Sequence, residues 1–151
     1  MPIATSSDLI ELSSENKTEE LANKIIKKLK ISDIIFLYGE MGVGKTTFAR
    51  FLINGLQKKE RSKLTEVTSP TFNLLHEYDL NILKINHYDL FRIKTTKELS
   101  NLDLFSDRKS SITIVEWPQL IKEKPKNLIE LNFKYGPENT KRIVQIKGLD
   151  L

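Results

Sequence analysis

Apolar residues recur at helical spacing in two stretches of the chain. Within residues 13–30, serines typical of a helix N-cap precede a stripe of apolar positions on one helical face: Leu21, Ala22, Ile25, Ile26 and Leu29. Residues 45–58 repeat the pattern, with four positions expected to face inward: Phe48, Phe51, Leu52 and Leu56. Because a spacing of three to four residues is typical of an amphipathic helix, both stretches are predicted to be helices.

Other apolar residues gather into short runs that predict strands. Residues 33–39 (DIIFLYG) form a continuous apolar run that ends at a glycine, and residues 111–117 (SITIVEW) form another that ends beside an acid. Each is interpreted as a buried strand. Residues 71–91 mix β-branched, aromatic and alternating positions on both sides of residues 79–81. This pattern predicts two strands joined by a tight turn.

The last third of the chain predicts a closing pair of strands. Residues 127–133 and 142–148 are expected to pair antiparallel across a loop at 134–141. Upstream, Thr95 and Glu98 have the spacing of a capping box at the start of a short helix. That helix would carry two apolar residues, Leu99 and Leu102. Helices and strands therefore alternate in an α/β order with an unusual share of antiparallel strand.

Composition narrows the class of protein. The 151 residues fit one domain, and the absence of cysteine excludes disulfides, thiolate zinc sites and cysteine nucleophiles. The formal net charge is +4, but the basic clusters at 58–63 and 122–126 are interpreted as solvated loops. Neither a signal peptide nor an apolar run of about 20 residues is present, so we expect a cytoplasmic protein without a membrane partner.

One motif carries specific chemistry. Gly39-x-x-x-x-Gly44-Lys45-Thr46 lies between a predicted strand and a predicted helix, which is the context of a phosphate-binding loop. In such a loop the main-chain N–H groups converge on phosphates, the lysine bridges the β- and γ-phosphates, and the threonine hydroxyl holds Mg²⁺. The expected ATP-binding residues here are Glu40, Met41, Gly42, Val43, Gly44, Lys45, Thr46 and Thr47. The predicted fold is therefore a single P-loop NTPase-like α/β domain over residues 1–151, with a mixed sheet flanked by helices.

A P-loop enzyme also needs a carboxylate at a strand end. Glu116 follows the run ITIV, and Asp89 follows the less apolar run KINHY. Glu116 is expected to reach Mg²⁺ and Asp89 to orient or deprotonate the attacking water, although the sequence also permits the reverse. The structural alternatives are an exposed strand terminus for Glu116 and a helix cap for Asp89.

A threonine, the tryptophan and the two histidines are weaker candidates for residues of the nucleotide site. Thr71 lies in the segment 68–72 (TSPTF), where it could either sense phosphate or form an ordinary turn. Trp117 could wall the nucleotide site or belong to the core. His76 and His87 are interpreted as packing or hydrogen-bonded residues and not as catalysts. The chain lacks both Asp-x-x-Gly after the P-loop and a downstream Asn-Lys-x-Asp, which argues against a GTPase.

Four motifs together resemble the bacterial TsaE (formerly YjeE) ATPases: LYGEMGVGKTTF, SPTF, HYDLFR and IVEWP, in this order. The resemblance covers roughly residues 18–118. It implies phosphate and Mg²⁺ roles for Lys45 and Thr46 and a metal-site acid at Glu116. It also assigns the second essential acid to Asp89. Thr71 matches the threonine of the family's switch-like loop, and Trp117 matches the tryptophan that follows the acid. Thr18 matches a threonine near the nucleotide's base more loosely. Glu40 departs from the family's usual aspartate, and Tyr88 and Phe91 exchange one aromatic for another.

The resemblance implies a function. It predicts a Mg²⁺-dependent ATPase that docks on a complex of TsaD and TsaB and supports threonylcarbamoylation of the adenosine beside the anticodon, meeting tRNA indirectly through that complex. No arginine finger stands out, so hydrolysis is expected to be slow alone and faster with the partner. The alternatives are a small-molecule kinase that uses the same P-loop, a nucleotide-dependent binding module and, more weakly, a direct reader of tRNA.

Overall fold

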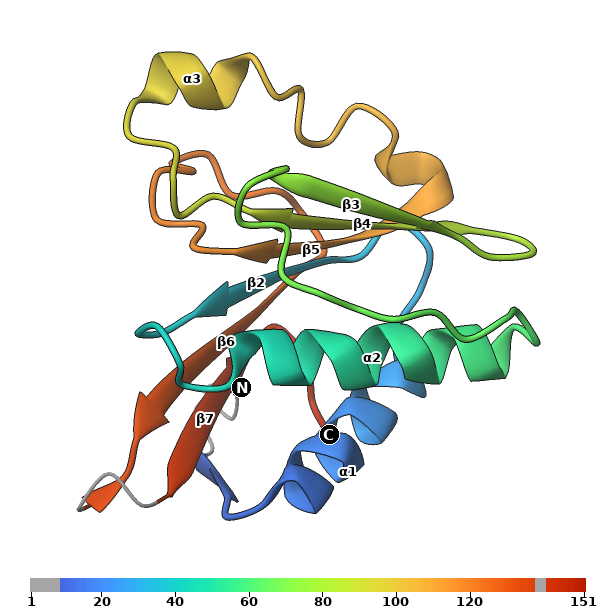
Figure 1. Cartoon of the computed structure of the whole chain (residues 1–151), viewed down its shortest axis with the longest axis vertical. Helices are drawn as coiled ribbons and strands as arrows, with labels where there is room; N and C mark the ends of the chain where they lie inside the picture. The colour runs from blue at the N-terminus through green and yellow to red at the C-terminus, as the bar shows by residue number, and fades with distance from the viewer. Residues whose placement is uncertain (1–8, 138–140) are drawn as a thin grey trace.

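The computed structural model describes residues 9–137 and 141–151 (Figure 1). Its elements follow along the chain as β1 (Leu9–Leu12), α1 (Glu15–Ile26), β2 (Ile34–Tyr38), α2 (Lys45–Lys59), β3 (Leu75–Asp79), β4 (Lys84–Asp89), α3 (Thr96–Ser100), the 3-10 turn η2 (Arg108–Ser110), β5 (Ser111–Glu116), β6 (Leu128–Tyr135) and β7 (Arg142–Lys147). The strands form one seven-stranded sheet in the order β1-β7-β6-β2-β5-β4-β3. Within the described residues, no helix is both long enough and apolar enough to cross a bilayer.

The sheet is mixed, as the sequence predicts. Strands β6, β2, β5 and β4 run parallel to one another in the centre. At one edge β3 pairs antiparallel with β4, and at the other edge β7 and β1 add two antiparallel pairs. Helices pack beside this sheet in Figure 1. The predicted α/β class with a large antiparallel component is therefore confirmed.

The ends of the sheet differ from the expectation in detail. The hydrophobic pattern does not predict β1, whose Leu9–Leu12 segment is only four residues long. β6 continues through Tyr135, so the loop expected at 134–141 is shorter than predicted, and residues 138–140 lie outside the described part. The tight turn between β3 and β4 is confirmed, because the Leu80 N–H donates to the Leu83 carbonyl over 2.8 Å.

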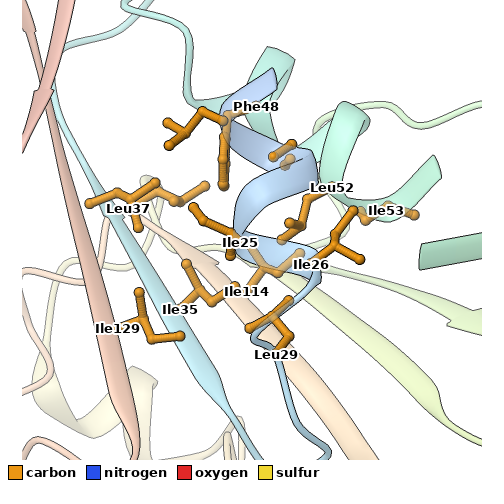
Figure 2. Close-up of a cluster of buried hydrophobic side chains, with 14 of the residues drawn as sticks. Ile25, Ile26, Leu29, Ile35, Leu37, Phe48, Leu52, Ile53, Ile114 and Ile129 are labelled. Atoms are coloured by element: carbon orange, nitrogen blue, oxygen red, sulfur yellow. The ribbon is translucent and has the colours of Figure 1, made fainter. Parts of the chain in front are cut away.

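α1 and α2 cover one face of the sheet and form the larger core (Figure 2). The whole apolar stripe predicted for residues 13–30 is buried, although α1 ends at Ile26 and Leu29 lies in the turn that follows. The Ser14 side chain accepts a hydrogen bond from the Lys17 N–H and so caps the start of α1. On α2, Phe48, Leu52 and Leu56 are buried as predicted, whereas Phe51 is only partly buried.

The opposite face of β2, β4 and β5 is covered by the irregular chain around α3. Apolar side chains from this segment pack on the sheet residues, and the buried members of the cluster are Ile34, Phe36, Tyr88, Leu90, Ile93, Leu104 and Val115. The Thr95 hydroxyl accepts from the Glu98 N–H, which confirms half of the predicted capping box. The Glu98 carboxylate accepts instead from the Thr95 hydroxyl and the Lys94 N–H. Leu102 lies just beyond the helix.

Strand register determines which polar side chains meet at the edge of the sheet. Asp89, the last residue of β4, is paired with Glu116, the last residue of β5, and Glu116 is also paired with Leu37 on β2. Since β2, β4 and β5 are parallel, their carboxyl ends lie at one edge. The chain leaves β2 at that edge and reaches the start of α2 through residues 39–44.

Gly39 occupies a position where a side chain would be strained. Its φ is +144°, and an added Cβ would lie 2.7 Å from the Phe133 carbonyl oxygen and 2.8 Å from Val43 Cγ1. We therefore predict that Gly39→Ala lowers the free energy of unfolding by about 1–3 kcal/mol, measured by urea denaturation. Gly136→Ala is the matched control, because its Cβ would meet nothing closer than 3.4 Å. Equal stability of the two variants would contradict the prediction.

Candidate functional site

Residues 39–44 form a loop that opens onto the start of α2. Gly44 is the N-cap of this helix, with a left-handed φ of 116° and no side-chain cap hydrogen bond. The first main-chain N–H groups of α2 therefore face outward at the loop, where a helix terminus attracts anions. This arrangement of strand, glycine loop and helix is the one that the sequence motif predicts.

Residues from four separate segments line one cavity of about 250 Å³ beside this loop. The cavity joins the loop and the start of α2 to the segment 68–72, the end of β4 and the end of β5. Its lining residues are Met41, Gly42, Gly44, Lys45, Thr46, Thr47, Ser69, Thr71, Asp89, Phe91, Glu116 and Trp117. Ten of the thirteen side chains and loop positions predicted as site residues therefore meet at one place.

The other three predicted site residues lie elsewhere. Val43 is fully buried in the main core, and Glu40 is exposed on the far side of the loop. Thr18, on α1, lines a second cavity of about 250 Å³ together with Val43 and the end of β1. Both cavities include Gly42, Gly44 and Thr47, so they adjoin the same loop.

Lys45 is a buried cation that lines the first cavity. Its side chain is 4% exposed, its ammonium donates to the Gly39 carbonyl, and Nζ lies 3.4 Å from the centroid of the Trp117 ring. Burial lowers the pKa of Lys45, while the nearby carboxylates of Glu116 and Asp89 oppose that shift. The ammonium thus has an aromatic face and two acids around it and remains a suitable partner for a further anion.

Glu116 is buried against Thr46. The Thr46 hydroxyl lies 3.0 Å from Glu116 Oε1 and 3.2 Å from Oε2, and His87 Nε2 lies 2.7 Å from Oε2. Carboxylate and hydroxyl oxygens are the protein ligands that Mg²⁺ prefers, and Mg²⁺ usually takes only one or two of them beside phosphate and water. Thr46 and Glu116 therefore fit a magnesium ion bound beside phosphates, and Glu116, not Asp89, is the acid adjacent to the threonine.

Asp89 fastens the segment 68–72 to the end of β4. Its Oδ2 accepts from the hydroxyls of Ser69 and Thr71, each over 3.0 Å, and its Oδ1 accepts from the Phe91 N–H over 2.9 Å. The last bond belongs to a turn, because the next helix begins only at Thr96, so Asp89 is not the helix cap considered as the alternative. The first two bonds join Asp89 to the predicted sensor segment.

Trp117 adopts a backbone conformation that is unusual for a tryptophan. Its φ is +59°, and its N–H donates to the Leu37 carbonyl on β2. A non-glycine residue in this region costs on the order of 1–3 kcal/mol and persists where the surroundings require it. The turn directs the ring over Lys45 and against Phe91, whose centroid is 4.9 Å away. Trp117 forms a wall of the cavity and is only partly buried.

Sequence reasoning missed three residues of this neighbourhood. Ser69 and Phe91 line the cavity, and the His87 side chain contacts the Glu116 carboxylate. Ser69 lies in the same short segment as Thr71, and this proximity in sequence could have identified it as a site residue. His87 was expected to be a packing or hydrogen-bonded residue, and it is hydrogen-bonded, but its partner could not be identified from the sequence. His76 is also hydrogen-bonded, with Nδ1 3.2 Å from the Thr68 carbonyl oxygen.

Comparisons with known proteins agree on one family. The family model of "Threonylcarbamoyl adenosine biosynthesis protein TsaE" matches residues 12–144. Proteins named tRNA threonylcarbamoyladenosine biosynthesis protein TsaE are similar to the chain. That of Rickettsia typhi is 38% identical over 90% of this chain and 92% of its own length. Those of Aquifex aeolicus and Borreliella burgdorferi are 36% and 33% identical over 87% and 93% of this chain, and 90% and 99% of their own lengths.

A solved structure supports the fold. The crystal structure of Bacillus subtilis YdiB superposes with a TM-score of 0.71 and covers 95% of this chain and 86% of its own. The two sequences are 21% identical, so this likeness concerns the fold alone.

The hydrogen bonds of Asp89 generate a prediction about the segment 68–72. Asp89→Ala removes the acceptor for Ser69 and Thr71 and leaves the Phe91 N–H without its partner. We expect amide exchange within 68–74 to accelerate by about tenfold, as one or two lost bonds of about 1 kcal/mol imply, measured by hydrogen–deuterium exchange mass spectrometry. Asp79→Ala, at the exposed opposite end of the hairpin, should leave that exchange unchanged. Unaltered exchange in Asp89→Ala would show that other contacts hold the segment.

Proposed function

This chain belongs to the TsaE family of threonylcarbamoyl adenosine biosynthesis proteins, and we propose that it acts there as a Mg²⁺-dependent ATPase. In this proposal ATP turnover supports threonylcarbamoylation of the adenosine beside the anticodon of tRNA. The observation that carries the ATPase assignment is the meeting of Lys45, Thr46, Asp89 and Glu116 at one cavity beside the glycine loop. These residues come from three elements and have the chemistry that phosphoryl transfer to water requires.

Each of these residues has a proposed task. The N–H groups of the glycine loop and the Lys45 ammonium bind the triphosphate and offset its charge. Thr46 and Glu116 hold Mg²⁺, which when bound neutralises charge on the β- and γ-phosphates. Asp89 accepts a hydrogen bond from the attacking water and thereby orients it, and Thr71, already bonded to Asp89, couples the segment 68–72 to that position.

A partner is proposed to complete the site. No arginine is among the residues that line the first cavity, and three of the described arginines have contacts elsewhere. Arg50 pairs with Glu15, Arg108 donates to the Lys126 carbonyl, and Arg92 lies over Phe72. An arginine that stabilises transition-state charge is worth about 10³–10⁵ in rate. We infer that the cytoplasmic TsaD–TsaB complex supplies or orders the missing group, and that tRNA is met through it.

Two other functions use the same cavity. A small-molecule kinase needs an acceptor site beside the γ-phosphate, and it would yield a phosphorylated metabolite with no free phosphate. A nucleotide-dependent binding module needs ATP binding without turnover. The presence of Asp89 at the same cavity as Thr46 and Glu116 favours hydrolysis over mere binding, because a second acid that can orient water is needed for turnover and not for binding.

Lys45→Ala tests the assignment directly. Removing the ammonium should lower phosphate release by on the order of 100-fold, as the loss of one charge-stabilising donor does in other active sites. Lys58→Ala, at the exposed far end of α2, is the matched control and should retain the wild-type rate. The measurement is phosphate release with and without TsaD and TsaB. Equal turnover in wild type and Lys45→Ala would contradict the ATPase assignment. A wild-type rate that TsaD and TsaB leave unchanged would contradict the proposal that a partner completes the site.

Asp89→Ala separates an ATPase from a binding module. The variant should bind ATP within about threefold of wild type but lose on the order of 100-fold in turnover, a typical loss for a base or water-orienting group. Trp117 is the sole tryptophan and lies over Lys45, so its fluorescence reports binding independently of turnover. If tRNA modification in a reconstituted system survives in Asp89→Ala, binding alone suffices and hydrolysis is incidental.

A further inference from the structure

His87 is a buried side chain to which the proposed mechanism assigns no task. It lies on β4, two residues before Asp89, and is 0% exposed. Residues two apart on a strand share a face, so His87 faces the α1–α2 side together with Ile85 and Asp89. Its register partner on β5 is Ile114. An aliphatic side chain would suit these surroundings better than an imidazole, whose burial is costly unless it forms hydrogen bonds.

The one hydrogen bond that the His87 side chain makes in the described part of the chain goes to the candidate metal acid. Nε2 is 2.7 Å from Glu116 Oε2, whereas Nδ1 has no partner there. A carboxylate oxygen only accepts hydrogen bonds, so Nε2 carries a proton in this contact. The imidazole thus presents one directed donor, and it aims that donor at Glu116.

The two side chains that contact Glu116 constrain its carboxylate to different degrees, and His87 constrains it more than Thr46 does. The Thr46 hydroxyl is nearly equidistant from both carboxylate oxygens, at 3.0 and 3.2 Å, so it does little to fix rotation of the carboxylate about its last bond. His87 contacts Oε2 alone, over a shorter distance. It therefore fixes the rotation of the carboxylate and leaves Oε1 with Thr46 as its one side-chain partner among the described residues.

We propose that His87 is a positioning residue that holds Glu116 Oε2 and so keeps Oε1 directed at the magnesium position beside Thr46. The inference rests on the proposed function for its metal, but the hydrogen bond itself is a property of the chain. Groups that orient a metal's protein ligands typically change metal affinity or activity by about 10–100-fold when they are removed.

The tautomer can be measured in the wild-type protein without any nucleotide. Long-range ¹H–¹⁵N NMR distinguishes Nε2–H from Nδ1–H imidazoles, and the chain contains only two histidines, His76 and His87. His76→Gln assigns the two sets of signals. We expect His87 to carry a proton on Nε2, and we expect its Nε2 shift to change in Glu116→Gln. An Nδ1–H tautomer, or an Nε2 shift that ignores Glu116→Gln, would overturn the inference.

Two substitutions of similar polarity then test the consequence for the metal. In His87→Gln the amide nitrogen is as many bonds from Cα as Nε2 and can still reach Glu116, whereas in His87→Asn it can occupy only the position of Nδ1. The readout is the ratio of ADP affinities with Mg²⁺ and with chelator, from calorimetry, alongside the rate of phosphate release. His87→Asn should lower the ratio and the rate by on the order of tenfold. His87→Gln should stay within about threefold of wild type.

Asn86→Leu controls for a general effect of disturbing β4. Asn86 is buried on the opposite face of the same strand and bonds Asp107, away from Glu116. This variant should lose stability but keep the wild-type affinity ratio. Equal behaviour of the Gln and Asn variants, or an equal loss in Asn86→Leu, would overturn the positioning role while leaving the proposed function intact. A wild-type protein that binds ADP equally with and without Mg²⁺ would overturn the proposed function, and the NMR result would still decide the His87–Glu116 contact.

Discussion

The register between β4 and β5 is the constraint on which the site depends. It pairs Asp89 with Glu116 at the ends of two parallel strands, next to the point where β2 continues into the glycine loop. Successive side chains of a strand alternate between faces, so a slip of one residue in β5 would send Glu116 to the opposite side of the sheet. The continuous apolar run of β5, with Ile112 and Ile114 in the α1–α2 core and Val115 in the other, prevents that slip. The packing of the sheet therefore determines the geometry of the acids.

Burying the charged side chains of this site costs folding free energy. Lys45, Asp89 and Glu116 are all at least 96% buried, and an isolated charge in such a position would cost several kcal/mol. Opposite charges and hydrogen bonds offset this cost: Lys45 lies near both acids, and each acid accepts at least two hydrogen bonds. The left-handed backbone of Trp117 adds strain at the same place. A fold that concentrates these unfavourable features in one cavity must obtain its stability from the two apolar clusters elsewhere.

Local patterns predicted most of the fold, and long-range contacts account for what they missed. The stripe on α1, the run of β5 and the glycine loop are all set by neighbours in sequence, and each was identified correctly. β1 was missed because a four-residue strand has almost no periodicity and is defined by its pairing with β7. The meeting of Thr46 with Glu116, 70 positions later, follows only from the sheet order, although the resemblance to a known family pointed to both residues.

The unusual polarity of β4 has a structural explanation that the sequence alone could not supply. Its residues KINHYD seemed less apolar than a central strand should be, yet all but the first are buried. On one face His87 bonds Glu116 and Asp89 bonds the segment 68–72, while on the other Asn86 bonds Asp107 in the segment that leads to β5. Each buried polar group therefore ties the strand to a different part of the chain. Because buried polar groups are retained only where such partners exist, a central strand that departs from the apolar pattern indicates the part of a sheet where function is concentrated.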